Sequence, residues 1–242
     1  MYWCCLSGFS EGFSDPIKQT YQLHGHVLEQ VQSAKYLGVT IQSNLRWNEH
    51  VDTITAKANR TIGFLRRNLK IKSRKIKEKA YKGLVRPLVE YASTVWDPYT
   101  DTQTKQIEMV QRRGVRFTTG NYQHTASVSK MIDTLEWQSL KTRRKNSRLT
   151  MMYKLKHGMV AISNPDLRQP LRTSRTSHSN SFLQLATSSN LRKYSFYPRT
   201  IVDWNKLPRE ATSSTSLTTF RQQLLLTTQL PTSDTQSTEF MS

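Results

Sequence analysis

The feature that most constrains the fold is the spacing of apolar residues after residue 48. Apolar side chains recur there every three or four residues, as they do on one face of an α-helix. They are Val51, Ile54, Ala58, Ile62, Leu65 and Leu69. Asn48 suits the N-cap of this helix, and Glu49 falls in its first turn, where a carboxylate is favoured. The segment is therefore predicted to be one amphipathic helix with a basic opposite face.

Similar spacings predict helices through much of the remaining chain. The predicted segments are 73–97, 101–119, 125–135, 138–157 and a short one near 216–227. In the first of these the predicted apolar face consists of Ile76, Ala80, Leu84, Leu88, Tyr91 and Val95. Pro87 lacks an N–H and is expected to kink or break that helix. The pair Asp97-Pro98 is expected to end it.

The residues before the first helix favour extended chain. Residues 21–23 and 27–28 flank His24-Gly25-His26, which predicts a hairpin. A second extended run covers 35–41, in which Gly38 indicates a close approach of the backbone to a neighbour. After Gly158 the chain is rich in Ser, Thr, Asn, Arg and Pro. The predicted fold class is mainly α, with a small N-terminal β-hairpin element and an irregular C-terminal segment.

Charge narrows the choice of partner. The 242 residues include 36 Lys and Arg against 17 Asp and Glu, which gives a net charge of +19. Such a surface attracts polyanions, of which nucleic acid is the commonest. No apolar run approaches the roughly 20 residues that a membrane-spanning helix needs, so no membrane partner is expected. Between residues 57 and 86 the only acidic residue is Glu78.

The usual enzyme motifs are missing from the sequence. Cys4 and Cys5 are adjacent and are predicted to be free thiols in a reducing compartment. His24 and His26 have no Cys or paired carboxylate beside them that would complete a metal site. The sequence also contains no G-x-S-x-G elbow and no Gly-rich phosphate loop. We therefore expect neither a hydrolase nor a metalloenzyme, and no cofactor.

Seven segments follow one another along the chain: YLGVTI at 36–41, LRWNEHV at 45–51, RTIGFLRRNLK at 60–70, LVRPLVEYASTVWDPYT at 84–100, EMVQRRGVRF at 108–117, MIDTLEWQSLKTRR at 131–144 and YSFYPRTIVDWNKLP at 194–208. Each segment alone is weak, but together and in this order they resemble the C-terminal end of reverse transcriptases from non-LTR (LINE-type, jockey-like) retrotransposons. The resemblance covers roughly residues 18–226.

The resemblance implies a domain organisation. By it, residues 20–46 form a hairpin like the end of a polymerase palm, and residues 47–160 form a basic helical thumb and post-thumb domain. Residues 1–19 are expected to be irregular, and 161–226 to be extended with a small apolar cluster. Residues 227–242 are expected to be a disordered tail.

Catalysis is not expected from this chain alone. Polymerisation needs two metal ions held by neighbouring carboxylates, and the family supplies them partly from an aromatic-x-Asp-Asp turn. The aspartates here are Asp15, Asp52, Asp97, Asp101, Asp133, Asp166, Asp203 and Asp234, and no two are adjacent. By resemblance, the intact enzyme would use Mg²⁺. We therefore expect a truncated polymerase fragment that is not an enzyme by itself.

The predicted partners are RNA, DNA or an RNA–DNA duplex, bound through phosphates without sequence specificity. The candidate contacts are Arg66, Arg67, Lys70, Lys72, Arg74, Lys75, Arg112, Arg113, Arg116, Arg143 and Arg144. The resemblance adds a primer-grip-like group: Lys35, Tyr36, Leu37, Gly38 and Val39. The expected location is cytoplasmic with access to the nucleus.

Two alternatives stay open. Apolar surface left by a missing palm would favour self-association or a protein partner, and a degenerate reading frame would have no function at all. Trp47, Trp96 and Trp137 can be read as base-stacking platforms or as core anchors, and the core reading is favoured.

Overall fold

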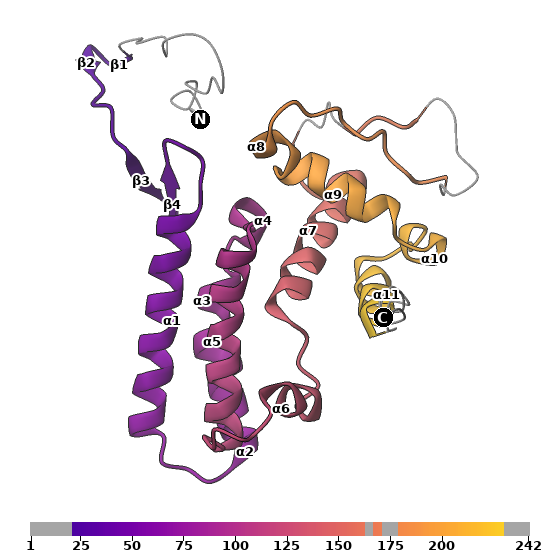
Figure 1. Cartoon of the computed structure of the whole chain (residues 1–242). Coiled ribbons are helices and arrows are strands. Elements are labelled where there is room, and N and C mark those ends of the chain that lie inside the picture. Colours follow the sequence, from indigo (N-terminus) through magenta and orange to yellow (C-terminus); the bar gives the residue numbers. More distant parts are fainter. Residues whose placement is uncertain (1–20, 163–166, 171–178, 230–242) are drawn as a thin grey trace, which may run out of the picture. The chain divides into compact units, whose positions relative to one another are not determined.

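The computed structural model of the chain describes residues 21–162, 167–170 and 179–229 (Figure 1). It is mainly helical, with two small antiparallel strand pairs near the start, so the predicted fold class is confirmed. The chain divides into two compact units, one up to Leu140 and one from Lys141. No helix in the described ranges is both long and apolar enough to cross a membrane.

The elements of the first unit are β1 (Gln22–Leu23), β2 (His26–Val27), β3 (Ser33–Tyr36), β4 (Val39–Gln42), α1 (Asn48–Asn68), α2 (Arg74–Ala80), the π-helical turn η1 (Tyr81–Val85), α3 (Arg86–Glu90), α4 (Ser93–Trp96), α5 (Asp101–Thr119) and α6 (Val128–Thr134). The elements of the second unit are α7 (Leu140–Lys156), α8 (Asn190–Lys193), α9 (Phe196–Asn205), α10 (Arg209–Thr212) and α11 (Leu217–Gln229).

Two hairpins precede the helices. β1 pairs with β2 across the predicted His24-Gly25 turn. The single extended run predicted over 35–41 is wrong, because the chain reverses at Leu37-Gly38 and β3 pairs with β4. Both turn residues have positive φ, 45° and 83°, as a two-residue hairpin turn that matches strand twist requires. Glycine at position 38 therefore serves the turn.

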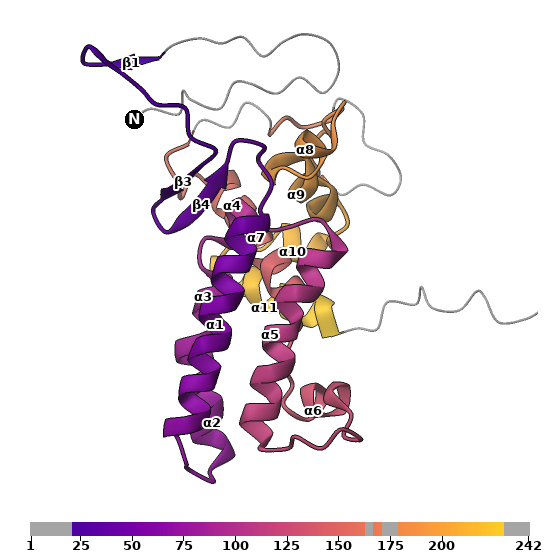
Figure 2. The ribbon, with the colours of Figure 1, turned by 60° about the vertical axis from the view of Figure 1, so that its left-hand side comes forward.

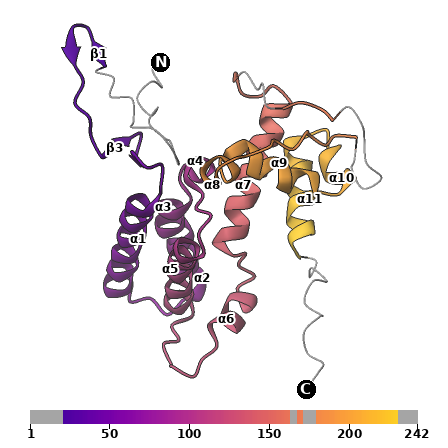
Figure 3. The same ribbon diagram turned by 45° about the horizontal axis from the view of Figure 1, so that its top comes forward.

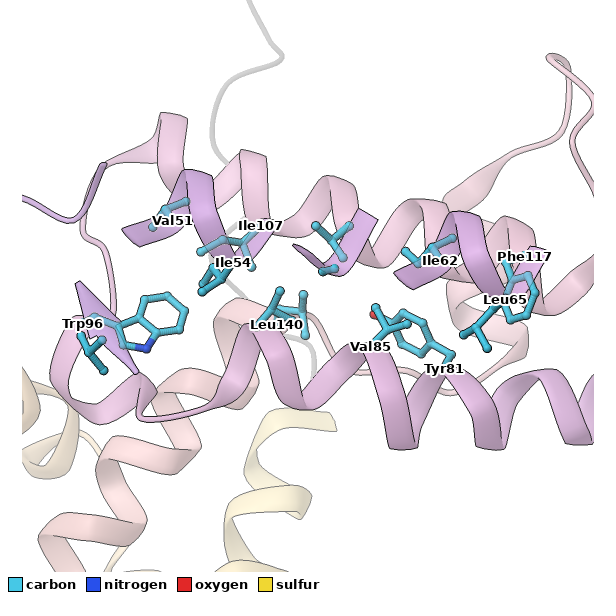
Figure 4. Packing of buried hydrophobic residues seen from close by; sticks show 14 residues of the cluster. Val51, Ile54, Ile62, Leu65, Tyr81, Val85, Trp96, Ile107, Phe117 and Leu140 are labelled. Atoms are coloured by element: carbon cyan, nitrogen blue, oxygen red, sulfur yellow. The ribbon is translucent and has the colours of Figure 1, made fainter. Parts of the chain in front are cut away.

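The core of the first unit lies between α1 and α5 on one side and η1 and α3 on the other. Figure 4 shows Val51, Ile54 and Ile107 toward one end of the cluster and Leu65 and Phe117 toward the other. Since α1 and α5 contribute their residues in the same order, the two helices run parallel and end at the same end of the unit (Figure 2).

The apolar face predicted for the segment after Ser73 is displaced by one residue. Tyr81, Val85 and Val89 are buried, whereas the predicted face residues Leu84 and Tyr91 are more than half exposed. Adjacent apolar pairs make both faces compatible with helical spacing, so the pattern alone does not choose between them. Packing against α5 decides for the Tyr81 face.

Pro87 does not break its helix directly. The chain forms η1 just before it, where the N–H of Arg86 donates to the carbonyl of Tyr81 five residues back. Pro87 then occupies the first turn of α3, where its missing N–H costs little. The break follows at Ala92, whose φ is 50°.

The second unit has its own apolar core. The helices α7, α9 and α11, drawn in Figure 3, contribute residues to it. Its buried members are Leu149, Met152, Tyr153, Phe182, Ile201, Trp204, Phe220 and Leu224. Apolar residues do gather around Ile201 and Trp204, but the extended chain expected over 161–226 is wrong where α8, α9 and α10 lie, because packing of α9 against α7 and α11 stabilises helix there. Of the tail predicted to be disordered, 227–242, the first three residues belong to α11. The rest of that tail and residues 1–19, predicted to be irregular, lie outside the described residues.

Candidate nucleic-acid interface

Basic residues gather where α1, α2 and α5 meet. α1 and α5 both end there, and α2 begins there after the linker of residues 69–73 (Figure 1). We call this surface the basic end. It comprises Arg66, Arg67, Lys70, Lys72, Arg74, Lys75 and Arg116, all of them exposed except Arg116, which is half-buried. The structure therefore brings together seven of the eleven predicted phosphate contacts.

Three arginines of the basic end are held by local contacts. The guanidinium of Arg66 lies over the ring of Tyr122, 5.3 Å from its centroid. Arg116 Nη1 donates to the carbonyl of Gln123 at 3.1 Å. Arg74 Nη2 donates to the carbonyl of Thr134, the last residue of α6, at 3.1 Å. These contacts join the ends of α1 and α5 to the segment after α5, and the start of α2 to the end of α6.

The basic end also contains three lysines, and all of them are exposed to solvent. Lys70 and Lys72 lie in the linker, and Lys75 lies in the first turn of α2. All three are exposed, and across residues 21–162 no carboxylate forms an ion pair with any of them. Their positive charge is consequently open to a polyanion.

Glu78, the only acidic residue between residues 57 and 86, offsets only part of the charge of the basic end. Glu78 forms an ion pair with Lys82 and accepts a hydrogen bond from Trp137 Nε1 at 3.1 Å. The hydrogen bond from Lys82 is the largest cause of a lowered pKa at Glu78, which burial partly opposes. Glu78 is therefore a carboxylate at neutral pH that is bound to Lys82 and Trp137, and its charge also attracts Arg74.

Part of the positive charge has a structural use. The C-terminal end of an α-helix carries partial negative charge, which nearby cations stabilise. Arg66 and Arg67 occupy the last turn of α1, and Arg116 the last turn of α5. These three arginines would therefore stabilise the fold even without a ligand.

The other predicted contacts lie apart from the basic end. Arg112 and Arg113 are exposed on α5, about two turns before its end. Arg143 and Arg144 lie on α7 in the second unit, and Arg144 is only 1% exposed. A guanidinium so buried offers no surface to a phosphate, so we omit Arg144 from the interface.

A second buried arginine of α7, Arg148, forms an ion pair within the second unit. Arg148 is 3% exposed, and its Nη2 lies 3.0 Å from Asp203 Oδ2 on α9. Lys145 lies 3.3 Å from the other oxygen of the same carboxylate. The basic cluster of α7 therefore includes charges that hold the second unit together, which the sequence pattern did not reveal.

The primer-grip-like residues form the tip of the β3–β4 hairpin. Lys35, Tyr36 and Leu37 are exposed, and Leu37 is 73% exposed, whereas Val39 is buried in the core. Tyr91, predicted to be in the core, is instead 59% exposed, and its Oη donates to the carbonyl of Leu37 at 3.1 Å. Tyr91 thus fixes the hairpin tip from outside the core.

His50 anchors the base of the same hairpin. It is buried, and its Nδ1 accepts a hydrogen bond from the backbone N–H of Thr40 at 3.2 Å. The rings of His50 and Trp96 form a T-shaped pair with centroids 5.1 Å apart. Burial lowers the pKa of His50 below its ordinary value, so the ring is neutral at neutral pH. The geometry requires that neutral form, because Nδ1 must accept a hydrogen bond.

The three tryptophans pack in the core, as the favoured interpretation predicts. Trp96 is fully buried in the core of the first unit, and Trp47 and Trp137 pack against that core. Trp137 stacks on Tyr81 with ring centroids 4.6 Å apart. These three rings are core anchors, and none of them is a free surface for a base.

Sequence reasoning missed Tyr122. It is 45% exposed and belongs to none of the apolar clusters in the described part of the chain. Partial burial raises the pKa of Tyr122, and the positive charge of Arg66 partly offsets that rise, so the phenol is neutral at neutral pH. The only available signal was its position directly after the basic helix 101–119.

The described residues contain no group of three or more His, Cys, Asp or Glu side chains that could hold a metal ion. Cys4 and Cys5 lie outside the described residues. The arrangement at the basic end can bind anions by charge and by hydrogen bonds from arginine.

Comparison with known proteins finds one informative relative. The chain is 28% identical over 104 residues to a protein of Drosophila melanogaster named "Probable RNA-directed DNA polymerase from transposon BS". The aligned region is 42% of this chain and 12% of that protein. No family model matches the chain, and no solved structure matches it. Part of the chain is therefore related in sequence to a transposon RNA-directed DNA polymerase.

Proposed function

We propose that the first unit is a thumb-like, non-catalytic nucleic-acid-binding unit that contacts the phosphates of a template–primer through its basic end. The observation that carries this proposal is the set of exposed lysines, Lys70, Lys72 and Lys75, none of which forms an ion pair with a carboxylate of residues 21–162. The relationship to a transposon RNA-directed DNA polymerase supports the choice of nucleic acid over other polyanions.

The mechanism is charge neutralisation. A cation that contacts a phosphate releases condensed counterions, and the gain in entropy drives binding. The arginines held by Tyr122, Gln123 and Thr134 contribute hydrogen-bond donors in fixed positions, which favours phosphate over a diffuse anion. Since the basic end displays charge without a pattern of base-reading side chains, binding should tolerate any sequence.

The test is a salt titration of the full chain against a labelled RNA–DNA primer duplex. With five or more phosphates contacted, log Kd should rise steeply and linearly with log salt, with a slope of roughly 4 or more. Lys70→Gln combined with Lys72→Gln should reduce this slope by about 2, because each lost phosphate contact removes about 1. Neither lysine is in a helix, so stability should be unaffected.

A matched control removes the same charge elsewhere. Lys193 and Lys206 are exposed lysines of the second unit, and Lys193→Gln with Lys206→Gln should leave the slope unchanged. Equal slope losses in both double variants would show that only net charge matters. Binding that is absent at about 50 mM salt, or that does not weaken with salt, would contradict phosphate binding altogether.

A second candidate function is protein interaction through the hairpin tip. Tyr36, Leu37 and Tyr91 are each more than half exposed, and the hydrogen bond from Tyr91 holds Leu37 in place. Exposed apolar side chains held in position favour a protein partner or a second copy of the chain. Oligomers that persist at high salt and dissociate in Leu37→Ser would support this role.

A further inference from the structure

The segment that follows α5 carries the strongest feature that phosphate binding does not explain. Tyr122 lies there with almost half of its surface exposed, beside the cations of the basic end. An aromatic ring on a phosphate-binding surface offers a ligand something that lysines cannot, namely a flat apolar face on which a base can stack.

The backbone around Tyr122 is fixed by several short-range contacts. Gly120 ends α5 with a φ of 69°. The N–H of Gln123 donates to Asn121 Oδ1 at 3.0 Å, and Arg116 donates to the Gln123 carbonyl. The residues on both sides of Tyr122 are thereby held, and the ring has a defined position before any ligand arrives. A pre-positioned ring loses little conformational freedom on binding.

Arg66 places a positive charge against the Tyr122 ring. Its guanidinium lies over the ring of Tyr122, and almost half of the surface of Tyr122 is still exposed to solvent. The same guanidinium belongs to the basic end, so a base on the ring and its phosphate on Arg66 are compatible with one bound nucleotide. Cation–π contact with arginine and base stacking are commonly combined in proteins that bind single strands.

We propose that Tyr122, backed by Arg66, is a stacking platform for an unpaired base, and that the basic end therefore prefers nucleic acid with single-stranded character over fully paired duplex. This inference rests on the proposed phosphate binding. A paired base exposes only its edge in a groove, because both faces are covered by neighbouring base pairs. Only a single strand, an overhang or a frayed end can present a base face to Tyr122.

The test compares two probes with the full chain. One is a single strand of about 12 nucleotides carrying 2-aminopurine, a length within the site sizes of single-strand binders. The other is the same strand in a blunt duplex. Tyr122→Leu should weaken binding of the single strand by about 5- to 100-fold, the range expected for one lost stack. It should leave duplex affinity and both salt slopes unchanged.

A conservative variant and a spectroscopic signal separate stacking from a structural role. Tyr122→Phe keeps the ring and should bind the single strand like the wild type. Stacking on the ring quenches 2-aminopurine emission, so quenching should occur with the wild type and Tyr122→Phe and be lost with Tyr122→Leu. The quenching measurement on the wild type alone tests the platform even if Tyr122→Leu folds poorly.

The outcomes distinguish the two proposals. If the wild type binds neither probe in a salt-dependent way, both phosphate binding and stacking fail. If both probes bind but Tyr122→Leu weakens them equally, or changes neither, phosphate binding stands and the platform is refuted. Equal weakening of both probes would mean that Tyr122 only supports Arg66. Absence of quenching with the wild type also refutes the platform.

Discussion

Replacing Gly114 on α5 by alanine should destabilise the first unit. A Cβ atom placed on Gly114 would lie within 3.0 Å of three carbons of the Tyr81 ring, including Cδ2 at 2.6 Å and Cζ at 2.8 Å. The ring cannot move aside easily, because Tyr81 is fully buried and stacks on Trp137 with an angle of 13° between the planes. Either α5 or the stacked pair must therefore shift.

The expected change in the free energy of unfolding is the difference between a packing cost and a gain in helix propensity. Overpacking a well-packed core costs about 1–3 kcal/mol and sometimes more. Alanine is favoured over glycine inside a helix by about 1 kcal/mol, which offsets part of this cost. Because three ring carbons are overlapped at once, the packing cost should lie near the upper end of its range. Gly114→Ala should lower the free energy of unfolding by roughly 2 kcal/mol.

The assay is urea unfolding of the full chain, followed by tryptophan fluorescence. Gly63→Ala on α1 is the matched control, because its new Cβ would meet only Arg67 Nη1 at the ordinary distance of 3.5 Å. This control should be stabilised by up to about 1 kcal/mol. Tyr81→Leu should recover part of the loss in Gly114→Ala, since the two sites share one contact. A Gly114→Ala protein as stable as the wild type would refute the reasoning.

Two further predictions concern buried titratable groups, His50 and the ion pair of Arg148 with Asp203. Because burial lowers the pKa of His50, the unfolded chain binds that proton more readily, and the free energy of unfolding should fall as the pH drops below 6.5. His50→Gln should remove this part of the slope in urea unfolding measured at several pH values, and an unchanged slope would contradict the assignment. Asp203→Asn should destabilise the second unit by roughly 1.5–3 kcal/mol, since the buried Arg148 loses its charged acceptor. Thermal unfolding would check this, and an unchanged midpoint would show that the pair contributes nothing net.

Helices with a single clear apolar stripe were predictable from the sequence. α1 and α5 have one such stripe each, and their bounds lie within one residue of those predicted. The segment of α2, η1 and α3 was harder, because Leu84 and Val85 are adjacent apolar residues that define two possible faces. The choice depends on Gly114, which lies some thirty residues away and makes room for Tyr81. No local pattern contains that information.

Some residues of the candidate site could likewise be predicted from the sequence, and others could not. The exposed cations near the end of α1 could be predicted, because charge on one side of an amphipathic helix faces solvent. The burial of Arg144 could not, because it depends on what packs around α7. The pairing of Tyr122 with Arg66 joins the segment after α5 to the end of α1 through the fold. Contacts of this kind follow from tertiary packing, which the spacing of residue types does not encode.

The arginines and lysines of the basic end differ in what the fold requires of them. Arg66 and Arg67 complement the end of α1, and Arg74 binds the last carbonyl of α6. Lys75, by contrast, lies in the first turn of α2, which contains no acidic residue. A cation at a helix N-terminus is unfavourable, because the partial charge there is positive. Helix stability therefore explains Arg66 and Arg67, and the contact with α6 explains Arg74, but neither explains Lys75, whereas the proposed polyanionic ligand would account for all four cations.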